Sequence, residues 1–378
     1  MKKVFFIFIL LLIPIGVYGE ELIPNAKSGI LIEANSGKII YEKDKDVELS
    51  VASMTKMVAQ IIILEEIEKG NIKWSDKVKV SRNAANMGGS QIYLKEGEVM
   101  SVEDLMKGIS VASGNDATVA MAEYISGSEE KFVKRMNSIV KKLGLKHTRF
   151  SNVTGLDEDN HFSSSYDMGI IARELVTRYS EILKFSSIYE DYLRKDTDNK
   201  FWLVNTNKLV SLYDGTDGLK TGHTDNAGYC LAATVKRGDL RLIAIVLGES
   251  DSKIRNSETM DLLDYGFNNV KLRKLKDKDN IIERVKVYKA NKEYVDVYLK
   301  DSLNVVEDIG KKKNYKYKIN IDNIKLPIKK NSVIGYINVL DKDKIITTGE
   351  LISKNNINKL SIFDLYKKTL EEIIVGII

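Results

Sequence analysis

Residues 53–69 read SMTKMVAQIIILEEIEK, and this stretch predicts the centre of the fold. Its apolar residues occupy nearly the whole helical circumference, and Gly70 follows as a helix stop. A helix that is apolar all round is buried inside its domain, so we expect a central helix from about Ser53 to Lys69. Ser53 and Lys56 are three residues apart at its start, and their side chains therefore share one face.

The Ser53–Lys56 pair has the residue types that nucleophilic catalysis requires. A serine hydroxyl is a poor nucleophile until a base removes its proton, and the Lys56 amine is the nearest candidate base. Its pKa must then fall well below the usual value of about 10.4, as burial and a second cation would cause. A lysine within a helix normally extends to solvent, but this apolar helix start offers no exposed exit.

A second motif, Ser113-Gly114-Asn115, follows about 60 residues later, between two helical stretches. A serine in that loop can relay a proton between the base and a leaving amine, and Asn115 can pair with a substrate amide. By itself the tripeptide is an ordinary turn or N-cap sequence. Only its combination with the other motifs favours a functional role.

The third motif, Lys220-Thr221-Gly222, precedes an extended apolar run. On an edge strand, Lys220 and Thr221 can bind a substrate carboxylate, while Gly222 lets a ligand backbone approach closely. Lys220 is also the obvious second cation for Lys56. The backbone N–H groups of Ser53 and His223 would form an oxyanion hole, in which each donor typically contributes about 10²–10³ in rate.

Strand signals at both ends of residues 20–270 surround a helical middle. Residues 35–37, an Asn-Ser-Gly turn, join two strand segments, and residues 231–235 and 240–247 are extended apolar runs. Helical periodicity dominates between them, and a helix at about 257–265 would pack back on the sheet. We therefore expect one α+β domain in which an antiparallel sheet is combined with an α-helical subdomain.

Beyond this domain the pattern changes twice. Residues 271–360 contain short alternating segments, which predict a small all-β domain, and we find no catalytic constellation in it. Residues 361–378 return to helical spacing but carry five charges, too many for a helix that crosses a bilayer. We expect an amphipathic helix that anchors the chain in a membrane surface. The alternative is a helix docked on the protein's own surface.

Residues 1–19 have the pattern of a signal peptide. Lys2 and Lys3 precede an apolar stretch over residues 4–17, and small residues permit cleavage near Gly19. The alternative is an uncleaved N-terminal anchor. In either case we expect an exported chain, held peripherally at the extracytoplasmic face of the cytoplasmic membrane.

Composition argues against several classes of function. The formal net charge of +5 is small for 378 residues, and no dense arginine-rich stripe favours nucleic-acid binding. The single cysteine, Cys230, excludes an intramolecular disulfide, and its apolar surroundings predict a buried thiol. Because there are only three histidines and no Cys/His cluster at metal-ligand spacing, we expect neither a metal site nor a cofactor.

The three motifs, in the order S-x-x-K, S-x-N and K-T-G, are the signature set of penicillin-binding proteins and related β-lactamases. Residues 151–156 (SNVTGL), His161, Asp167, residues 220–229 and Arg255 extend the likeness. Over nearly its whole length the chain resembles the low-molecular-weight penicillin-binding proteins, specifically the D-alanyl-D-alanine carboxypeptidases.

The resemblance implies a penicillin-binding, transpeptidase-like α+β domain, followed by the small β-rich domain and the anchoring helix. It implies that Ser53 attacks the carbonyl between the two terminal D-alanines of a peptidoglycan stem pentapeptide, with Lys56 as base and Ser113 as proton relay. Together with Lys220, Arg255 would hold the terminal carboxylate. β-Lactam antibiotics would acylate Ser53 in the same way.

Two other functions fit parts of this pattern. A class A β-lactamase shares the three motifs, but such an enzyme would carry a Glu-x-x-Leu-Asn run, which this sequence lacks, and S-G-N stands here in place of S-D-N. The added β-rich segment also argues against a β-lactamase. The other alternative is a non-catalytic scaffold that binds cell wall, and the complete set of reactive residues disfavours it.

Overall fold

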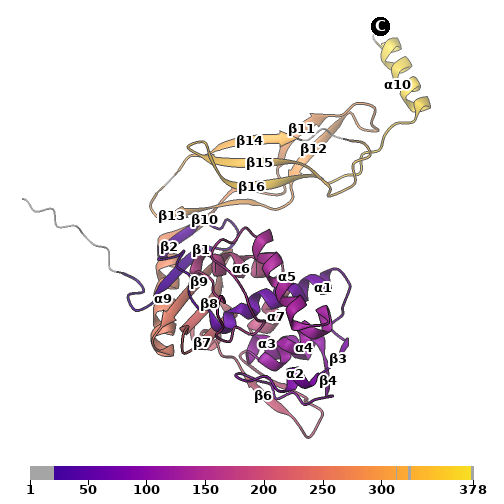
Figure 1. The fold of residues 1–378 in the computed structure, drawn as a ribbon. Coiled ribbons are helices and arrows are strands. Elements are labelled where there is room, and N and C mark those ends of the chain that lie inside the picture. The colour runs from indigo at the N-terminus through magenta and orange to yellow at the C-terminus, as the bar shows by residue number, and fades with distance from the viewer. Residues whose placement is uncertain (1–20, 312, 322–324, 376–378) are drawn as a thin grey trace, which may run out of the picture.

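The computed structural model describes residues 21–311, 313–321 and 325–375, so the predicted signal segment, residues 1–19, lies outside the described part. Figure 1 shows a helix-rich N-terminal body, a β-rich body next to it, and one helix at the end farthest from the N-terminal body. The N-terminal body is built on a five-stranded antiparallel sheet in the order β2-β1-β9-β8-β7. The strands of this sheet are β1 Ser28–Glu33, β2 Ile39–Lys43, β7 Thr216–Thr224, β8 Gly228–Arg237 and β9 Leu240–Glu249.

Helices cover both faces of this sheet. Successive side chains along a strand point to opposite faces, and apolar side chains occur on both of them. In β1, Ile30 and Ile32 belong to the large core that the sheet shares with most of the helices. Leu31 lies on the other face, in a second core with Leu263 of α9 (Ser252–Asn269). The result is the α+β architecture with an antiparallel sheet that the sequence predicts.

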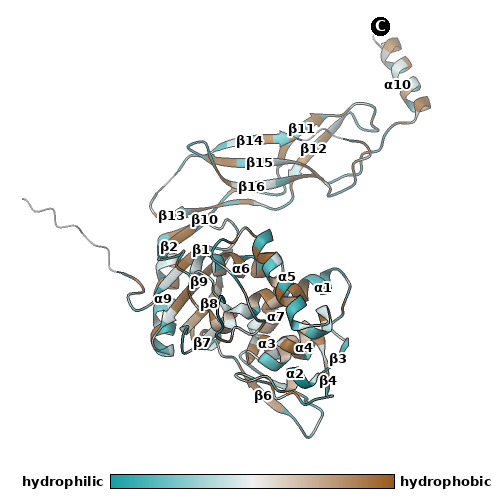
Figure 2. Ribbon diagram, viewed as in Figure 1, coloured by the Kyte–Doolittle hydropathy of each residue, from teal (hydrophilic) through white to brown (hydrophobic). Residues whose placement is uncertain are grey.

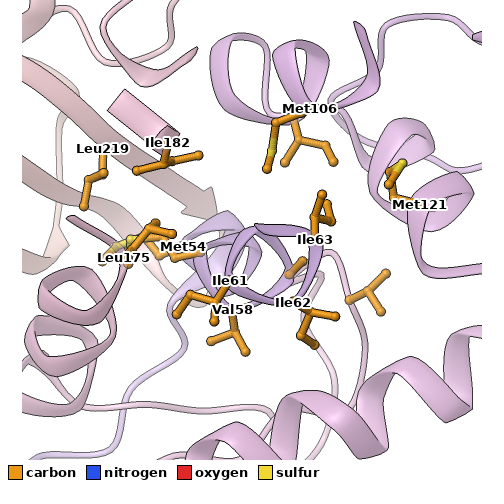
Figure 3. Close-up of a cluster of buried hydrophobic side chains, with 14 of the residues drawn as sticks. Met54, Val58, Ile61, Ile62, Ile63, Met106, Met121, Leu175, Ile182 and Leu219 are labelled. Atoms are coloured by element: carbon orange, nitrogen blue, oxygen red, sulfur yellow. The ribbon is translucent and has the colours of Figure 1, made fainter. Parts of the chain in front are cut away.

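The central buried helix is confirmed. A 3₁₀ turn, η1 (Ala52–Thr55), continues directly into α1 (Lys56–Glu68), so the α-helix itself begins three residues later than predicted, with Ser53 in the 3₁₀ turn. From Lys56 to Leu64 every α1 side chain is buried. Figure 3 shows apolar side chains of neighbouring elements, such as Met106 and Leu175, surrounding α1 on several sides.

The other helices of this body form the subdomain around α1. One of them, α3 (Val102–Val111), begins directly after Ser101, whose hydroxyl accepts the Asp104 N–H as an N-cap. The predicted helix at 257–265 is longer in the structure: α9 begins at Ser252, five residues earlier, where the Asp251 side chain caps it, and ends at Asn269. The remaining helical elements are α2 Arg82–Ala85, α4 Asn115–Ser126, α5 Glu129–Lys142, α6 Ser165–Thr177, η2 Ser180–Ile182, α7 Leu183–Ser186 and α8 Leu209–Leu212.

Two short hairpin-like sheets border the helical subdomain. Their strands are β3 Lys77–Lys79 with β4 Val99–Ser101, and β5 Glu190–Leu193 with β6 Phe201–Val204.

The β-rich body has its own hydrophobic core and two antiparallel sheets, one of two strands (β10-β13) and one of five (β11-β12-β16-β15-β14). An ion pair of 2.8 Å between Lys38 Nζ and Asp308 Oδ1 links it to the N-terminal body. Its strands are β10 Val270–Lys276, β11 Ile281–Lys286, β12 Tyr294–Leu299, β13 Leu303–Asp308, β14 Lys316–Ile321, β15 Val333–Asp341 and β16 Lys344–Ser353.

The last described element is α10 (Ile362–Val375), which projects away from the β-rich body (Figure 1). Figure 2 shows hydrophobic and hydrophilic segments together on this helix. Its large apolar side chains are exposed, with Ile362 at 90% and Phe363 at 76%. Among the described residues, no helix has both the length and the apolar character needed to cross a membrane.

Candidate active site

Ser53 and Lys56 meet at the junction of η1 and α1. Lys56 Nζ lies 2.6 Å from Ser53 Oγ and donates a second hydrogen bond of 2.7 Å to the Thr154 carbonyl. The turn that presents Ser53 is unusual, because Ala52 before it has a φ of +46°, in the left-handed region. The Thr154 contact was not predicted from the sequence, since it joins segments about 100 residues apart. It fixes the Lys56 amine at the serine hydroxyl.

Lys56 has no exposed surface. Burial, and after it the charge of Lys220, hold the pKa of the Lys56 ammonium well below its usual value, although the Asp116 carboxylate opposes the shift. The amine is therefore available as a base at a pH where an exposed lysine is fully protonated. The second cation anticipated from the sequence is the one that the structure places here.

Lys220 and Thr221 lie in β7, the edge strand of the sheet. Lys220 is buried, and burial followed by the charge of Arg255 lowers its pKa to about 7. The Thr221 hydroxyl donates 2.8 Å to Thr206 Oγ1, a residue that the sequence did not single out.

Two glycines allow the segments of the site to come close to η1. A Cβ atom at Gly222 would lie 2.6 Å from the Val51 carbonyl oxygen, so β7 can approach the serine turn only with glycine at this position. Gly155 has a φ of +83°, and a Cβ atom there would lie 1.9 Å from the Ala52 carbonyl oxygen. Gly155 follows Thr154, so this close approach also sets the carbonyl that holds Lys56.

Ser113 and Asn115 lie where α3 ends and α4 begins. Ser113 has a φ of +63°, and in the described part of the chain its buried Oγ has no hydrogen-bond partner. Asn115 donates Nδ2 to the Gly88 carbonyl at 2.7 Å, whereas its buried Oδ1 has no partner among the described residues. Buried polar atoms are normally bonded, so this pair of atoms indicates a place where a ligand binds.

Asp116 holds the segment that faces Asn115, and the sequence did not identify it. Its carboxylate accepts the backbone N–H groups of Ile92, at 3.0 Å, and Leu94, at 3.0 Å. Asn115 N in turn donates 2.7 Å to the Ser90 carbonyl. Residues 88–94 are therefore tied to the start of α4, and they form one wall beside Asn115.

His161 supports the Thr154 segment from behind. Its Nδ1 accepts the Ser151 N–H at 3.1 Å, so the ring proton is on Nε2, which lies 2.8 Å from Thr55 Oγ1. Burial lowers the pKa of His161 to about 4, which keeps the ring neutral. The sequence showed His161 only within the family resemblance. In the structure, His161 holds Ser151 and Thr55 in place through these two hydrogen bonds.

The remaining predicted site residues lie at the margin. His223 follows Gly222 in β7, and its exposed ring stacks on Tyr229 with centroids 4.1 Å apart. Arg255 is buried in α9 and donates to Asn256 Oδ1 at 2.8 Å. Its charge reaches Lys220, which links it to the carboxylate-binding part of the site.

The described residues give less support to a reactive cysteine, to a metal site or to a second binding groove. Cys230 is buried in β8, as predicted, and burial raises the pKa of its thiol to about 11, which disfavours a reactive thiolate. No group of three His, Cys, Asp or Glu side chains in the described ranges has the arrangement of a metal site. A groove of about 1100 Å³ beside β4 and β6 is lined by none of the motif residues, and its Arg194 and Glu98 pair with each other at 2.6 Å.

Comparison with known proteins agrees with this geometry. Residues 20–251 match the family model described as D-alanyl-D-alanine carboxypeptidase, and residues 271–359 match that of the penicillin-binding protein 5 C-terminal domain. The chain is 46% identical over 361 residues to D-alanyl-D-alanine carboxypeptidase DacF of Bacillus subtilis, covering 94% of this chain and 92% of that protein.

Solved structures show the same likeness. Penicillin-binding protein 5 from Haemophilus influenzae superimposes with a TM-score of 0.71 at 32% identity, covering 89% of this chain and 98% of that one. A penicillin-binding protein from Listeria monocytogenes, in its ampicillin-bound form, gives a TM-score of 0.58 at 30% identity over 64% of this chain and 98% of its own. The chain belongs to the D-alanyl-D-alanine carboxypeptidase family of low-molecular-weight penicillin-binding proteins.

Proposed function

We propose that this chain is a serine carboxypeptidase that removes the terminal D-alanine from peptidoglycan stem pentapeptides through an acyl-enzyme on Ser53. The observation that carries the proposal is the 2.6 Å contact between Lys56 Nζ and Ser53 Oγ. The contact supports nucleophilic catalysis because the buried Lys56 amine has a lowered pKa and can take the hydroxyl proton. The name of its relative DacF supports the same substrate.

In the first half of the reaction, neutral Lys56 takes the proton from Ser53 Oγ, which bonds to the carbonyl carbon between the two D-alanines. The backbone N–H groups of Ser53 and His223 are the proposed donors to the oxyanion. As the carbon–nitrogen bond breaks, the proton passes from Lys56 through the Ser113 hydroxyl to the leaving amine. The Ser113 Oγ supports this relay, because it has no hydrogen-bond partner among the described residues and can accept or donate a new one.

In the second half, Lys56 takes a proton from water, which attacks the ester carbon, and the tetrapeptide leaves as Ser53 regains its proton. Lys220, Thr221 and Arg255 supply the charge and hydrogen bonds for the terminal carboxylate of the substrate. Asn115 would bind the substrate amide with its unbonded side-chain oxygen.

Penicillin fits the same site as a mimic of the terminal dipeptide. Its strained ring carbonyl would occupy the position of the scissile carbonyl, and its carboxylate the position near Lys220. The ring-opened product remains linked to its leaving group, so the acyl-enzyme would deacylate slowly. The ampicillin-bound relative supports this expectation.

Release of D-alanine from a peptide that ends in Lys-D-Ala-D-Ala tests the proposal directly. The chain from residue 20 onward should release it, Ser53→Ala should not, and Ser138→Ala, an exposed serine in α5, should match the parent. Hydrolysis of β-lactams without D-alanine release would favour the β-lactamase alternative. Absence of both reactions in a folded protein would favour the scaffold.

The domain organisation and location are part of the proposal. Residues 1–19 would be removed on export, residues 20–270 would form the peptidase domain, residues 271–360 the β-rich domain and residues 361–378 the membrane anchor. The exposed apolar side chains of α10 support the anchor. A chain that ends at Leu360 should leave the membrane fraction, and equal fractionation of both forms would contradict the anchor.

A further inference from the structure

The charges of the chain are divided unevenly between its two bodies. Residues 271–360 contain 22 Lys and Arg against 12 Asp and Glu, a formal charge of +10. Residues 20–270 contain 32 against 38, a formal charge of −6. An asymmetry of this size indicates that the β-rich body interacts with a polyanion or an anionic surface.

Part of the positive charge gathers where α10 leaves the β-rich body. Three segments meet there, residues 287–293, 325–331 and 354–360. The Leu360 N–H donates 2.9 Å to the Lys289 carbonyl, which fixes the root of α10 against the first segment. This end of the body is the one farthest from the peptidase fold (Figure 1).

The second segment is held in the same place. Ile328 and Ile357 form an antiparallel bridge, with the Ile328 N–H 2.9 Å from the Ile357 carbonyl. The Lys330 N–H donates 2.7 Å to Asn356 Oδ1. The lysines of all three segments are therefore carried by one backbone-bonded platform rather than by independent loops.

Five of the six exposed lysines on this platform, all except Lys325, form a surface that we call the basic end. None of them makes an ion pair with a described residue, in contrast to Lys300, which is 2.6 Å from Glu350. Glu293 lies on the same platform but forms an ion pair with Lys286, with 3.3 Å between Glu293 Oε1 and Lys286 Nζ. The members of the basic end are Lys289, Lys292, Lys329, Lys330 and Lys359.

We propose that the basic end binds the anionic headgroups of a phospholipid membrane, as a second attachment beside α10. The helix begins two residues after Leu360 and exposes large apolar side chains that suit a bilayer interface. When α10 lies in that interface, its hydrogen-bonded root holds the lysines on the membrane side of the β-rich body, and attraction to headgroups acts over a Debye length of about 8 Å at physiological salt. Tyr288, which is 73% exposed on the same platform, suits the headgroup level.

An attachment of this kind accounts for both the helix and the charge. A single amphipathic or acyl element binds membranes reversibly, and a polybasic surface supplies the second signal that stable attachment needs. The attraction depends on lipid charge, whereas apolar burial of α10 does not. The proposal rests on the membrane anchor proposed for α10, but it is independent of the peptidase activity and stands whether or not Ser53 is acylated.

The test compares vesicle binding of the full chain from residue 20 onward. Vesicles of phosphatidylcholine alone and of phosphatidylcholine with 30% phosphatidylglycerol are sedimented with the protein at low salt and with 0.5 M NaCl. The parent should prefer the anionic vesicles, and replacing the five lysines of the basic end with glutamine should reduce that preference at least tenfold. Binding to neutral vesicles, which reflects α10, should not change.

A matched variant removes the same charge elsewhere on the same body. Five exposed lysines outside the basic end are replaced with glutamine, namely Lys271, Lys278, Lys311, Lys342 and Lys344. This control should keep the parent's preference for anionic vesicles. An equal loss in both variants would show a response to net charge alone and overturn the proposal. So would a basic-end variant that keeps its lipid preference but loses binding to soluble polyphosphate, since the partner would then be an anionic polymer.

Discussion

Lys56 Nζ lies 2.6 Å from Ser53 Oγ, and the Thr154 carbonyl holds the same amine from another side at 2.7 Å. The lysine cannot move to solvent, because it has no exposed surface. Its nearest group is therefore the hydroxyl that it would deprotonate, and its lowered pKa makes it able to do so. Burial and the repulsion of Lys220 are thus used to make a base from a residue that is ordinarily an acid.

Replacing Lys56 with methionine should remove the base and keep the shape of the helix start. We expect the rate of penicillin acylation to fall by about 10²–10⁴, the usual contribution of general base catalysis. Stopped-flow measurement of acylation checks this. Lys69→Met, at an exposed lysine next to the end of α1, should leave the rate unchanged. A Lys56→Met protein that is acylated at the parent rate would contradict the role of Lys56.

The pH dependence of kcat/KM should reflect the ionisation of Lys220. Its pKa of about 7 in the free protein means that it loses its positive charge as pH rises through 7, and with it the attraction for a substrate carboxylate. We therefore expect kcat/KM for a D-Ala-D-Ala peptide to fall above about pH 7, because this ratio follows the ionisation of the free enzyme. The same peptide with a C-terminal amide should lack the falling limb. A falling limb in both peptides would assign it to another group.

Removing the buried charge of Lys220 should stabilise the protein. Between pH 7 and 10.5 the unfolded chain binds a proton at Lys220 that the folded chain does not, so the stability of the fold decreases as the pH falls through this range. Below pH 7 both states are protonated, and the destabilisation by Lys220 is complete. We expect Lys220→Met to raise the free energy of unfolding by about 2–4 kcal/mol at pH 6, with the gain shrinking as pH rises toward 10.5. Denaturant titration at several pH values measures it.

An exposed lysine provides the comparison for that experiment. Lys342→Met should change the free energy of unfolding by less than about 0.5 kcal/mol at every pH, as surface substitutions usually do. A stability gain of Lys220→Met that did not vary with pH would show that packing, and not the charge, is responsible.

Gly155→Ala should damage both stability and the site. The new Cβ atom would overlap the Ala52 carbonyl oxygen at 1.9 Å, so η1 or the Thr154 segment must move. We expect a loss of more than about 3 kcal/mol in the free energy of unfolding and much slower penicillin acylation. Gly144→Ala shares a positive φ, +69°, but has nothing within 4 Å, so it should cost about 1 kcal/mol and leave acylation intact. Equal effects of the two substitutions would show that the contact with η1 is unimportant.

Much of this architecture can be predicted from periodicity. The apolar circumference of residues 53–69 predicts the buried helix, and with it the burial of Lys56, because a lysine at that position has no route to solvent. The runs at 231–235 and 240–247 lie within β8 and β9. Local sequence is informative here because each element buries one continuous set of side chains.

The parts that the sequence does not reveal are long-range or conformational. No residue type signals that Ala52 has a positive φ, and that turn replaces the expected first turn of helix at Ser53. The carbonyl of Thr154 and the ring of His161 act through contacts across about 100 residues, which pattern alone does not pair. Asp251, by contrast, carried an available signal, since a capping aspartate marks the true start of α9.

The role of Ser53 as the nucleophile is tested most directly by finding which residue becomes acylated. The chain from residue 20 onward is incubated briefly with penicillin, quenched in acid and digested, and the peptides are analysed by mass spectrometry. We expect one penicilloyl group, on Ser53, in the parent and in Ser138→Ala, and none in Ser53→Ala. A penicilloyl group on any other residue, or an undiminished adduct in Ser53→Ala, would contradict this role of Ser53.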